Sequence, residues 1–181
     1  MPLFDWAFDV AQEKLAQALP RRWAHVQGVA CRAQSLAQVV GRDADLLEAA
    51  AILHDIGYAP DLVKTNFHPL DGAIFLEDIR APKRIVNLVA HHSYARLEAD
   101  LRGLADRMNG FDDEHGMTRD ALWYCDQTTS PDGKEVKATD RIIEIKRRYG
   151  PGNLVTKFIT EASSELLAAV ARTEYRMIQS D

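Results

Sequence analysis

The 181-residue chain lacks the long hydrophobic runs that a membrane-spanning helix requires. Such a helix needs about 18 or more consecutive apolar residues. The first residues also show no basic segment followed by an apolar one, so nothing in them resembles a secretory signal. We therefore expect a cytoplasmic protein that does not enter a membrane.

Cysteine is scarce as well, because the chain contains only Cys31 and Cys125. Two cysteines at this separation form neither a disulfide framework nor a zinc-knuckle or redox-pair motif. We expect both to be buried thiols without a chemical role.

Positive charge does not dominate the composition. The 22 Lys and Arg residues face 27 Asp and Glu residues, which gives a formal net charge of -5 with neutral histidines. Proteins that coat nucleic acid need basic residues to neutralise many phosphates. The charge therefore argues against a long nucleic acid as partner, whereas a local basic patch could still hold a small phosphate.

What the sequence does contain is helical periodicity, since apolar residues recur at helical intervals and no segment alternates as a strand does. This pattern predicts an all-α, single-domain helical bundle over residues 1–181, a length that one hydrophobic core can serve. Gly57 is expected to end one helix in the left-handed conformation. Helices are predicted at 4–19, 21–40, 43–56, 68–79, 83–92, 95–108, 118–126 or 118–129, 139–149 and 153–177.

The segment 46–53 is apolar around nearly its whole circumference, which predicts a central helix, and it ends at His54 and Asp55. A buried imidazole beside a carboxylate needs a partner that compensates the lost hydration. A divalent cation would meet this need, so the pair indicates a metal site.

Most of the other histidines also lie at or beside the ends of apolar helices. These are His25, His68, His91 and His92. Imidazoles and carboxylates that converge from several helices form the metal centres of helical bundles. Asp126 ends a largely apolar helix, where an unpaired carboxylate would be costly, and is a further ligand candidate.

The neighbours His91 and His92 differ in their expected direction. The apolar residues Ile85, Leu88 and Val89 have the helical spacing that continues to His92. His92 is therefore the preferred ligand, and His91 is a residue beside the site or a substitute ligand.

The order of these residues resembles the motif of the HD superfamily of metal-dependent phosphohydrolases. That motif consists of a histidine, then a His-Asp pair, then a distant aspartate, which here are His25, His54–Asp55 and Asp126. The segment 54–57, with the sequence HDIG, is similar to a known variant of this motif, and the segments 68–73 and 91–93 extend the likeness. The resemblance covers residues 22–130. Residues 131–181 then form C-terminal helices that pack on this core or on a partner subunit, in which case the protein is a homodimer.

The resemblance implies a first metal ion held by His25, His54, Asp55 and Asp126. Asp55 would bridge to a second ion that His68 and His92 complete, as in HD subgroups with two metals. Two ions would activate water and neutralise phosphoryl oxygens, with Asp55 and His54 as catalytic residues. The ligand types do not distinguish Mn, Fe, Mg, Co, Ni and Zn.

One position departs from the resemblance. Many HDIG sequences continue with a lysine that reaches the substrate phosphate, whereas Tyr58 follows Gly57 here. A cation for that phosphate must come from elsewhere, and Lys64 and Arg96 are our candidates for substrate binding.

Together these features predict an enzyme that hydrolyses a phosphoester or phosphoanhydride bond in a small, nucleotide-like phosphorylated substrate. Two alternatives stay open. Some HD proteins with a similar ligand set are di-iron oxygenases. The chain could also be a non-catalytic binding module in which a metal only stabilises the helices.

Overall fold

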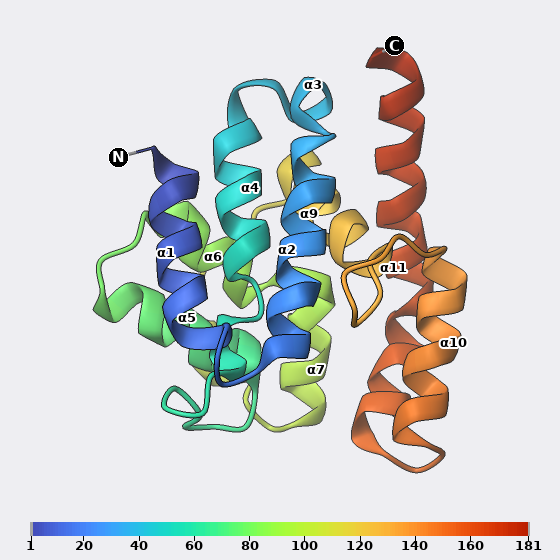
Figure 1. Cartoon of the computed structure of the whole chain (residues 1–181). Coiled ribbons are helices and arrows are strands. Elements are labelled where there is room, and N and C mark those ends of the chain that lie inside the picture. The colour runs from blue at the N-terminus through green and yellow to red at the C-terminus, as the bar shows by residue number, and fades with distance from the viewer. Residues whose placement is uncertain (1, 181) are drawn as a thin grey trace.

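Helix α4 (Ala44–Leu53) lies at the centre of the computed structural model, which describes residues 2–180 (Figure 1). Its residues from Ala49 to Leu53 are all buried. It packs against α1 (Leu3–Leu15), α2 (Pro20–Gln34), α6 (Lys83–Ala90) and α9 (Met117–Gln127). Neighbouring helices therefore cover most of the apolar circumference of this segment, as predicted for a central helix.

Helices and turns make up the rest of the described range, and residues 2–180 contain no β-strand. This confirms the predicted all-α fold. Over the same range, no helix combines the length and the apolar character needed to cross a membrane. The remaining elements are α3 (Ala37–Val40), η1 (Gly41–Asp43), η2 (Ile56–Tyr58), α5 (His68–Asp78), η3 (His92–Tyr94), α7 (Ala95–Leu101), α8 (Ala105–Met108), α10 (Ala138–Tyr149) and α11 (Leu154–Ser180).

Two of the predicted helices are broken. The expected helix 21–40 stops at Gln34, and α3 follows it after Leu36, which is fully buried at the break. The expected helix 95–108 divides into α7 and α8 around Gly103, whose φ of 70° lies in the left-handed region. Apolar residues recur at helical intervals across both breaks, so the spacing predicted continuous helices there.

Gly57 does not have the left-handed conformation that we expected, since it is absent from the positive-φ glycines of the described chain. Its small size serves close packing instead. A Cβ atom on Gly57 would lie 2.1 Å from the carbonyl oxygen of His68 and 2.5 Å from the backbone nitrogen of Gly72. Gly57 thus lets η2 lie directly against the start of α5.

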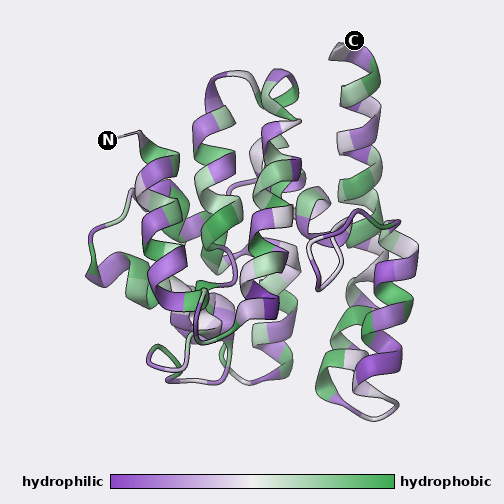
Figure 2. Ribbon diagram, in the orientation of Figure 1, coloured by the Kyte–Doolittle hydropathy of each residue, from purple (hydrophilic) through white to green (hydrophobic). Residues whose placement is uncertain are grey.

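The C-terminal helices α10 and α11 pack against each other, and α11 lies along α9 (Figure 1). Trp123 of α9, Ile145 of α10 and Phe158 of α11 belong to one buried cluster at this junction. Hydrophobic and hydrophilic residues alternate along the ribbon of α11, as Figure 2 shows, so one side of this helix contributes to the core.

One of the two cysteines differs from the prediction that both are buried. Cys125 is fully buried in the main core, whereas Cys31 is exposed. Val29, Ala30 and Ala33 form the buried side of α2, and Cys31 lies outside that side.

Candidate metal centre

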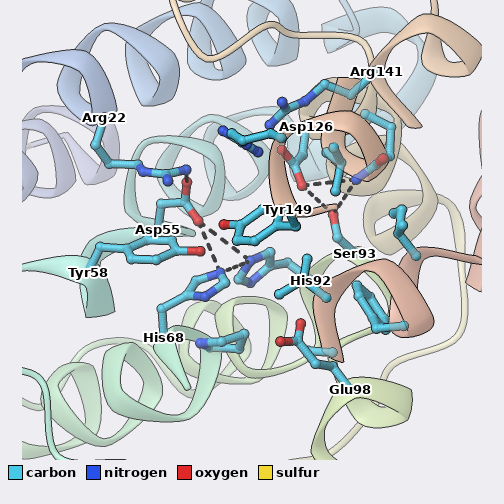
Figure 3. A pocket seen from close by; sticks show the side chains of 18 residues that line it. Arg22, Asp55, Tyr58, His68, His92, Ser93, Glu98, Asp126, Arg141 and Tyr149 are labelled. Carbon is cyan, nitrogen blue, oxygen red and sulfur yellow. Dashed lines mark hydrogen bonds and ion pairs between the residues drawn. The ribbon is translucent and has the colours of Figure 1, made fainter. Parts of the chain in front are cut away.

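Two groups of three potential metal ligands lie next to each other between the helices. Figure 3 shows four of these residues, Asp55, His68, His92 and Asp126, where they border a pocket. Within each group the ligand atoms all lie within 4.8 Å of one another. One group consists of His25, His54 and Asp126, and the other consists of Asp55, His68 and His92. The two groups draw on α2, α5, α9 and the segments that follow α4 and α6, so residues from 25 to 126 converge at one place.

Asp55 faces both groups, with a different carboxylate oxygen toward each. Its Oδ2 lies 3.7 Å from Nε2 of His25 and 3.5 Å from Nε2 of His54. Its Oδ1 lies 3.2 Å from Nε2 of His68 and 3.8 Å from Nε2 of His92. This arrangement would allow one carboxylate to bridge two cations.

Three of the imidazoles are oriented in the same way by backbone carbonyls. Nδ1 of His25 donates a hydrogen bond to the carbonyl oxygen of Ser130 at 2.9 Å. Nδ1 of His54 donates to the carbonyl oxygen of Ala51, and Nδ1 of His92 to that of Val89, each at 2.7 Å. Because a carbonyl can only accept, the proton lies on Nδ1 and the lone pair of Nε2 points into the centre. Nε2 of His54 is buried and has no hydrogen-bond partner in the described chain. An orphaned, inward-facing lone pair of this kind is what a metal ion would satisfy.

The protonation states also fit a metal. Burial lowers the pKa of His54, His68 and His92 below the ordinary 6.5, so these imidazoles are neutral at pH 7. Burial alone would raise the pKa of Asp55, but the charge of Arg22, which donates to this carboxylate, outweighs it and holds that pKa well below the usual range. Hydrogen bonding to the Asp126 carboxylate likewise outweighs burial and lowers the pKa of this group. Neutral imidazoles and ionised carboxylates are the forms that bind metals.

The spacing of the ligand atoms is compatible with cations. Nε2 of His25 lies 3.2 Å from Oδ1 of Asp126, and Nε2 of His54 lies 3.8 Å from the same oxygen. Ligand atoms bound at about 2.0–2.2 Å to one ion stand at similar separations. The donor set of imidazole nitrogens and carboxylate oxygens suits divalent first-row metals.

The HD domain model matches residues 22–144 of this chain. The chain belongs to the HD domain family. Members of this family are generally metal-dependent hydrolases, and the matched range holds every residue of the two ligand groups. The predicted resemblance is thereby confirmed, and the match reaches beyond residue 130 into α10. Comparisons with curated proteins and with solved structures gave no match.

Ser93 orients Asp126, one of the potential metal ligands of this HD domain. Its hydroxyl donates to Oδ2 of Asp126, and Nε2 of Gln127 donates to the same oxygen at 3.2 Å. These bonds leave Oδ1 of Asp126 for the group with His25. Ser93 and Tyr94 both have positive φ, at 47° and 62°, which is a costly backbone conformation for residues with a side chain. The strained turn therefore directs the Ser93 hydroxyl at the ligand.

The position that is lysine in many HDIG sequences has a different structure here. The ring of Tyr58 stacks on His68, with centroids 4.0 Å apart, and the guanidinium of Arg22 lies 4.1 Å from the centroid of Tyr58. Nη1 of Arg22 also donates to Oδ2 of Asp55 at 2.6 Å. Arg22 thus brings a positive charge to the centre from the start of α2.

A cavity of about 90 Å³ opens over the centre and exposes Asp55, His68, His92 and Asp126 to it. Part of its wall comes from the C-terminal helices. Arg141 and Tyr149 of α10 face the same pocket as the ligands, as Figure 3 shows. Sequence reasoning assigned no role to these helices, because no motif links residues beyond 130 to the histidines.

Three predicted site residues lie elsewhere. His91 belongs to neither ligand group, because its Nε2 donates to the carbonyl of Phe111 at 2.9 Å. Lys64 and Arg96 do not line the cavity. The side chain of Lys64 is 59% exposed and lies 4.0 Å from Asp78, while Arg96 donates to the side chain of Asn109 at 3.2 Å.

Arg22 was the site residue that the sequence could have revealed. It precedes His25 by three positions on one helix, and residues at this spacing share a face. Since the resemblance places His25 in the metal centre, the same face should carry Arg22 there. The roles of Ser93 and Arg141 depend on loop conformation and packing, which the sequence pattern does not report.

Proposed function

We propose that this HD protein is a phosphohydrolase that cleaves a phosphoester or phosphoanhydride bond in a small, nucleotide-like substrate. The observation that carries the proposal is the position of Asp55, which turns one oxygen to each of the two ligand groups. Two divalent ions bound there would lower the pKa of a water molecule and neutralise phosphoryl oxygens.

The chain's own residues would prepare the site for this reaction. One ion would be held by His25, His54 and Asp126, and the other by His68 and His92. Asp55 would contribute to both ions. The Arg22 guanidinium borders the cavity and can pair with a phosphoryl oxygen of the substrate. Burial raises the pKa of Tyr58, so its phenol stays protonated at neutral pH and covers one side of His68.

The size and charge of the molecule support a small substrate. A cavity of about 90 Å³ can admit a phosphoryl group but not a folded polymer. The net charge of -5 would repel a long nucleic acid. A small phosphorylated molecule meets both conditions.

The test is a metal-reconstitution assay on the full chain. Protein stripped by a chelator is reloaded separately with Mn²⁺, Fe²⁺, Co²⁺, Mg²⁺, Ni²⁺ or Zn²⁺ and given nucleoside mono-, di- and triphosphates and p-nitrophenyl phosphate. We expect metal-dependent release of phosphate or a nucleotide from at least one substrate. Absence of turnover with every metal would overturn the proposal.

The same samples separate the two alternatives. Oxygen consumption by the iron-loaded protein, without hydrolysis, would identify an oxygenase. A binding module would lose thermal stability on chelation but show no turnover in any state, whereas a hydrolase would lose both stability and turnover.

A further inference from the structure

One face of α10 is turned toward the cavity over the metal centre. The residues on it are Arg141, Ile145, Arg148 and Tyr149, and their spacing places them on one side of a helix. None of them belongs to the two ligand groups. The face therefore places two arginines, Arg141 and Arg148, in the cavity wall. Neither arginine is needed to hold a metal ion.

Arg141 is buried and incompletely paired. Only 6% of its side chain is exposed, and its Nη1 donates to Oε2 of Glu144 at 2.6 Å. Its Nε is buried without a hydrogen-bond partner among residues 2–180. A guanidinium has five N–H donors, and a buried donor that is left unsatisfied is costly. Arg141 thus lies in the cavity wall with a guanidinium that Glu144 satisfies only in part.

The counter-charge on this face is smaller than the charge of the arginines. Glu144 pairs with Arg141 and also lies 3.4 Å from Nε of Arg148. One carboxylate thus serves two guanidinium groups on α10. The remaining positive charge is available to a ligand.

A second hollow, of about 380 Å³, adjoins the cavity. Arg22, Tyr58 and Arg148 line both spaces, and Pro20 and Pro131 line only the outer one. A substrate whose reacting phosphate lies over the metal ligands would extend past these arginines into the outer hollow. The inner cavity alone, at about 90 Å³, is too small for a whole nucleotide.

We propose that Arg141 and Arg148 form a binding site for a second phosphate group, so that the enzyme prefers substrates in which another phosphate adjoins the reacting one. This inference rests on the proposed phosphohydrolase function. It narrows the substrate class from phosphate esters in general to phosphoanhydrides and closely spaced bisphosphates. Arginine suits this role because its planar fork binds phosphate through two parallel hydrogen bonds.

The first test measures binding in the absence of metal and turnover. Metal-free protein is titrated calorimetrically with methylenediphosphonate, which has two phosphonate groups, and with methylphosphonate, which has one. We expect wild type to prefer the diphosphonate and the Arg141→Met variant to bind it at least about 10-fold more weakly. An unchanged preference in Arg141→Met would overturn the inference.

Two further variants guard against a folding artefact. Arg141→Lys keeps the charge near Glu144 but lacks the fork, so its affinity should fall between those of wild type and Arg141→Met. Arg176→Met is the matched control, because Arg176 is exposed and lies about 27 Å along α11 from Phe158 in the cavity wall. Loss of diphosphonate binding in Arg176→Met as well would contradict a specific site.

The second test is kinetic and separates this inference from the proposed function. Wild type should show a KM for a nucleoside diphosphate at least about 10-fold below that for the monophosphate, and Arg141→Met should abolish this difference with a smaller effect on kcat. Equal KM values in wild type would overturn the inference while the hydrolase function stands. No hydrolysis of any substrate, together with an Arg141-dependent diphosphonate preference, would overturn the function but keep the anion site.

Discussion

Gly57 and His68 touch through their backbones, because a Cβ atom on Gly57 would stand 2.1 Å from the His68 carbonyl oxygen. This contact joins the segment with His54 and Asp55 to the helix that begins at His68. It therefore holds the backbones that carry Asp55 and His68 close together, and Oδ1 of Asp55 lies 3.2 Å from Nε2 of His68. A glycine that has no left-handed φ is thus required for the geometry of the ligand groups.

The substitution Gly57→Ala should consequently disturb both the fold and the metal centre. The added methyl group must displace backbone atoms, so we expect a loss of roughly 3 kcal/mol in the free energy of unfolding, at the upper end for overpacking. Urea denaturation and elemental analysis would measure the two effects. Gly110→Ala is the control, because nothing lies within 4 Å of its added Cβ atom. A Gly57→Ala protein with wild-type stability and full metal content would contradict the contact.

Replacement of Asp55 by Asn tests the bridging geometry. An amide offers only one oxygen, so it cannot face both ligand groups as the carboxylate does. We expect bound metal to fall and hydrolysis to drop at least about 100-fold, more than for loss of an outer hydrogen bond. Mass-spectrometric metal analysis and turnover should change together, while the exposed control Asp9→Asn keeps both. A metal-replete, active Asp55→Asn variant would refute the bridging role.

Two substitutions of Ser93 separate its hydrogen bond from its backbone strain. Ser93→Ala and Ser93→Gly both remove the hydroxyl that binds Asp126, so each should weaken metal affinity about 10- to 100-fold. Glycine tolerates the φ of 47°, so Ser93→Gly should be more stable than Ser93→Ala by about 1 kcal/mol. Metal titration and chemical denaturation would measure these quantities. Wild-type metal affinity in both variants would show that the hydroxyl does not position Asp126.

The stability of the metal-free protein should depend on pH through the buried imidazoles. Burial lowers the pKa of His54, His68 and His92 in the folded state from the ordinary 6.5. Below pH 6.5 the unfolded chain therefore binds more protons than the folded chain, and the free energy of unfolding falls as pH falls.

Denaturant titrations between pH 8 and pH 5 would measure this dependence. We expect a plateau above pH 7 and a decline below about 6.5. Asp55 and Asp126 add little in this range, since their pKa values are lowered from 3.8 and they act only at lower pH. His115→Gln is the control substitution, because His115 is 77% exposed and belongs to neither ligand group. A flat curve down to pH 5 would show that the imidazoles are not held neutral by the fold.

Much of the ligand set could be predicted because buried polarity is visible in a sequence. His54 and Asp55 end the most apolar helix, and the order of the remaining motif residues adds His25 and Asp126. The helical stripe also pointed to His92 rather than His91, even though α6 ends at Ala90 and His92 begins η3. Lys64 and Arg96, the predicted substrate-binding residues, lie near the ligands in sequence but do not line the cavity.

The sequence by itself determined the helical periodicity, the HD motif and the chemical types of the ligands, since these depend on residue identity and local spacing. Only the tertiary structure decided which oxygen of Asp55 faces which histidines, and that α10 turns Arg141 toward the same cavity. The physical reason is that periodicity describes one helix at a time. The packing of α11 and α10 against α9, through side chains from Trp123 to Phe158, sets the distance between groups that are far apart in the chain.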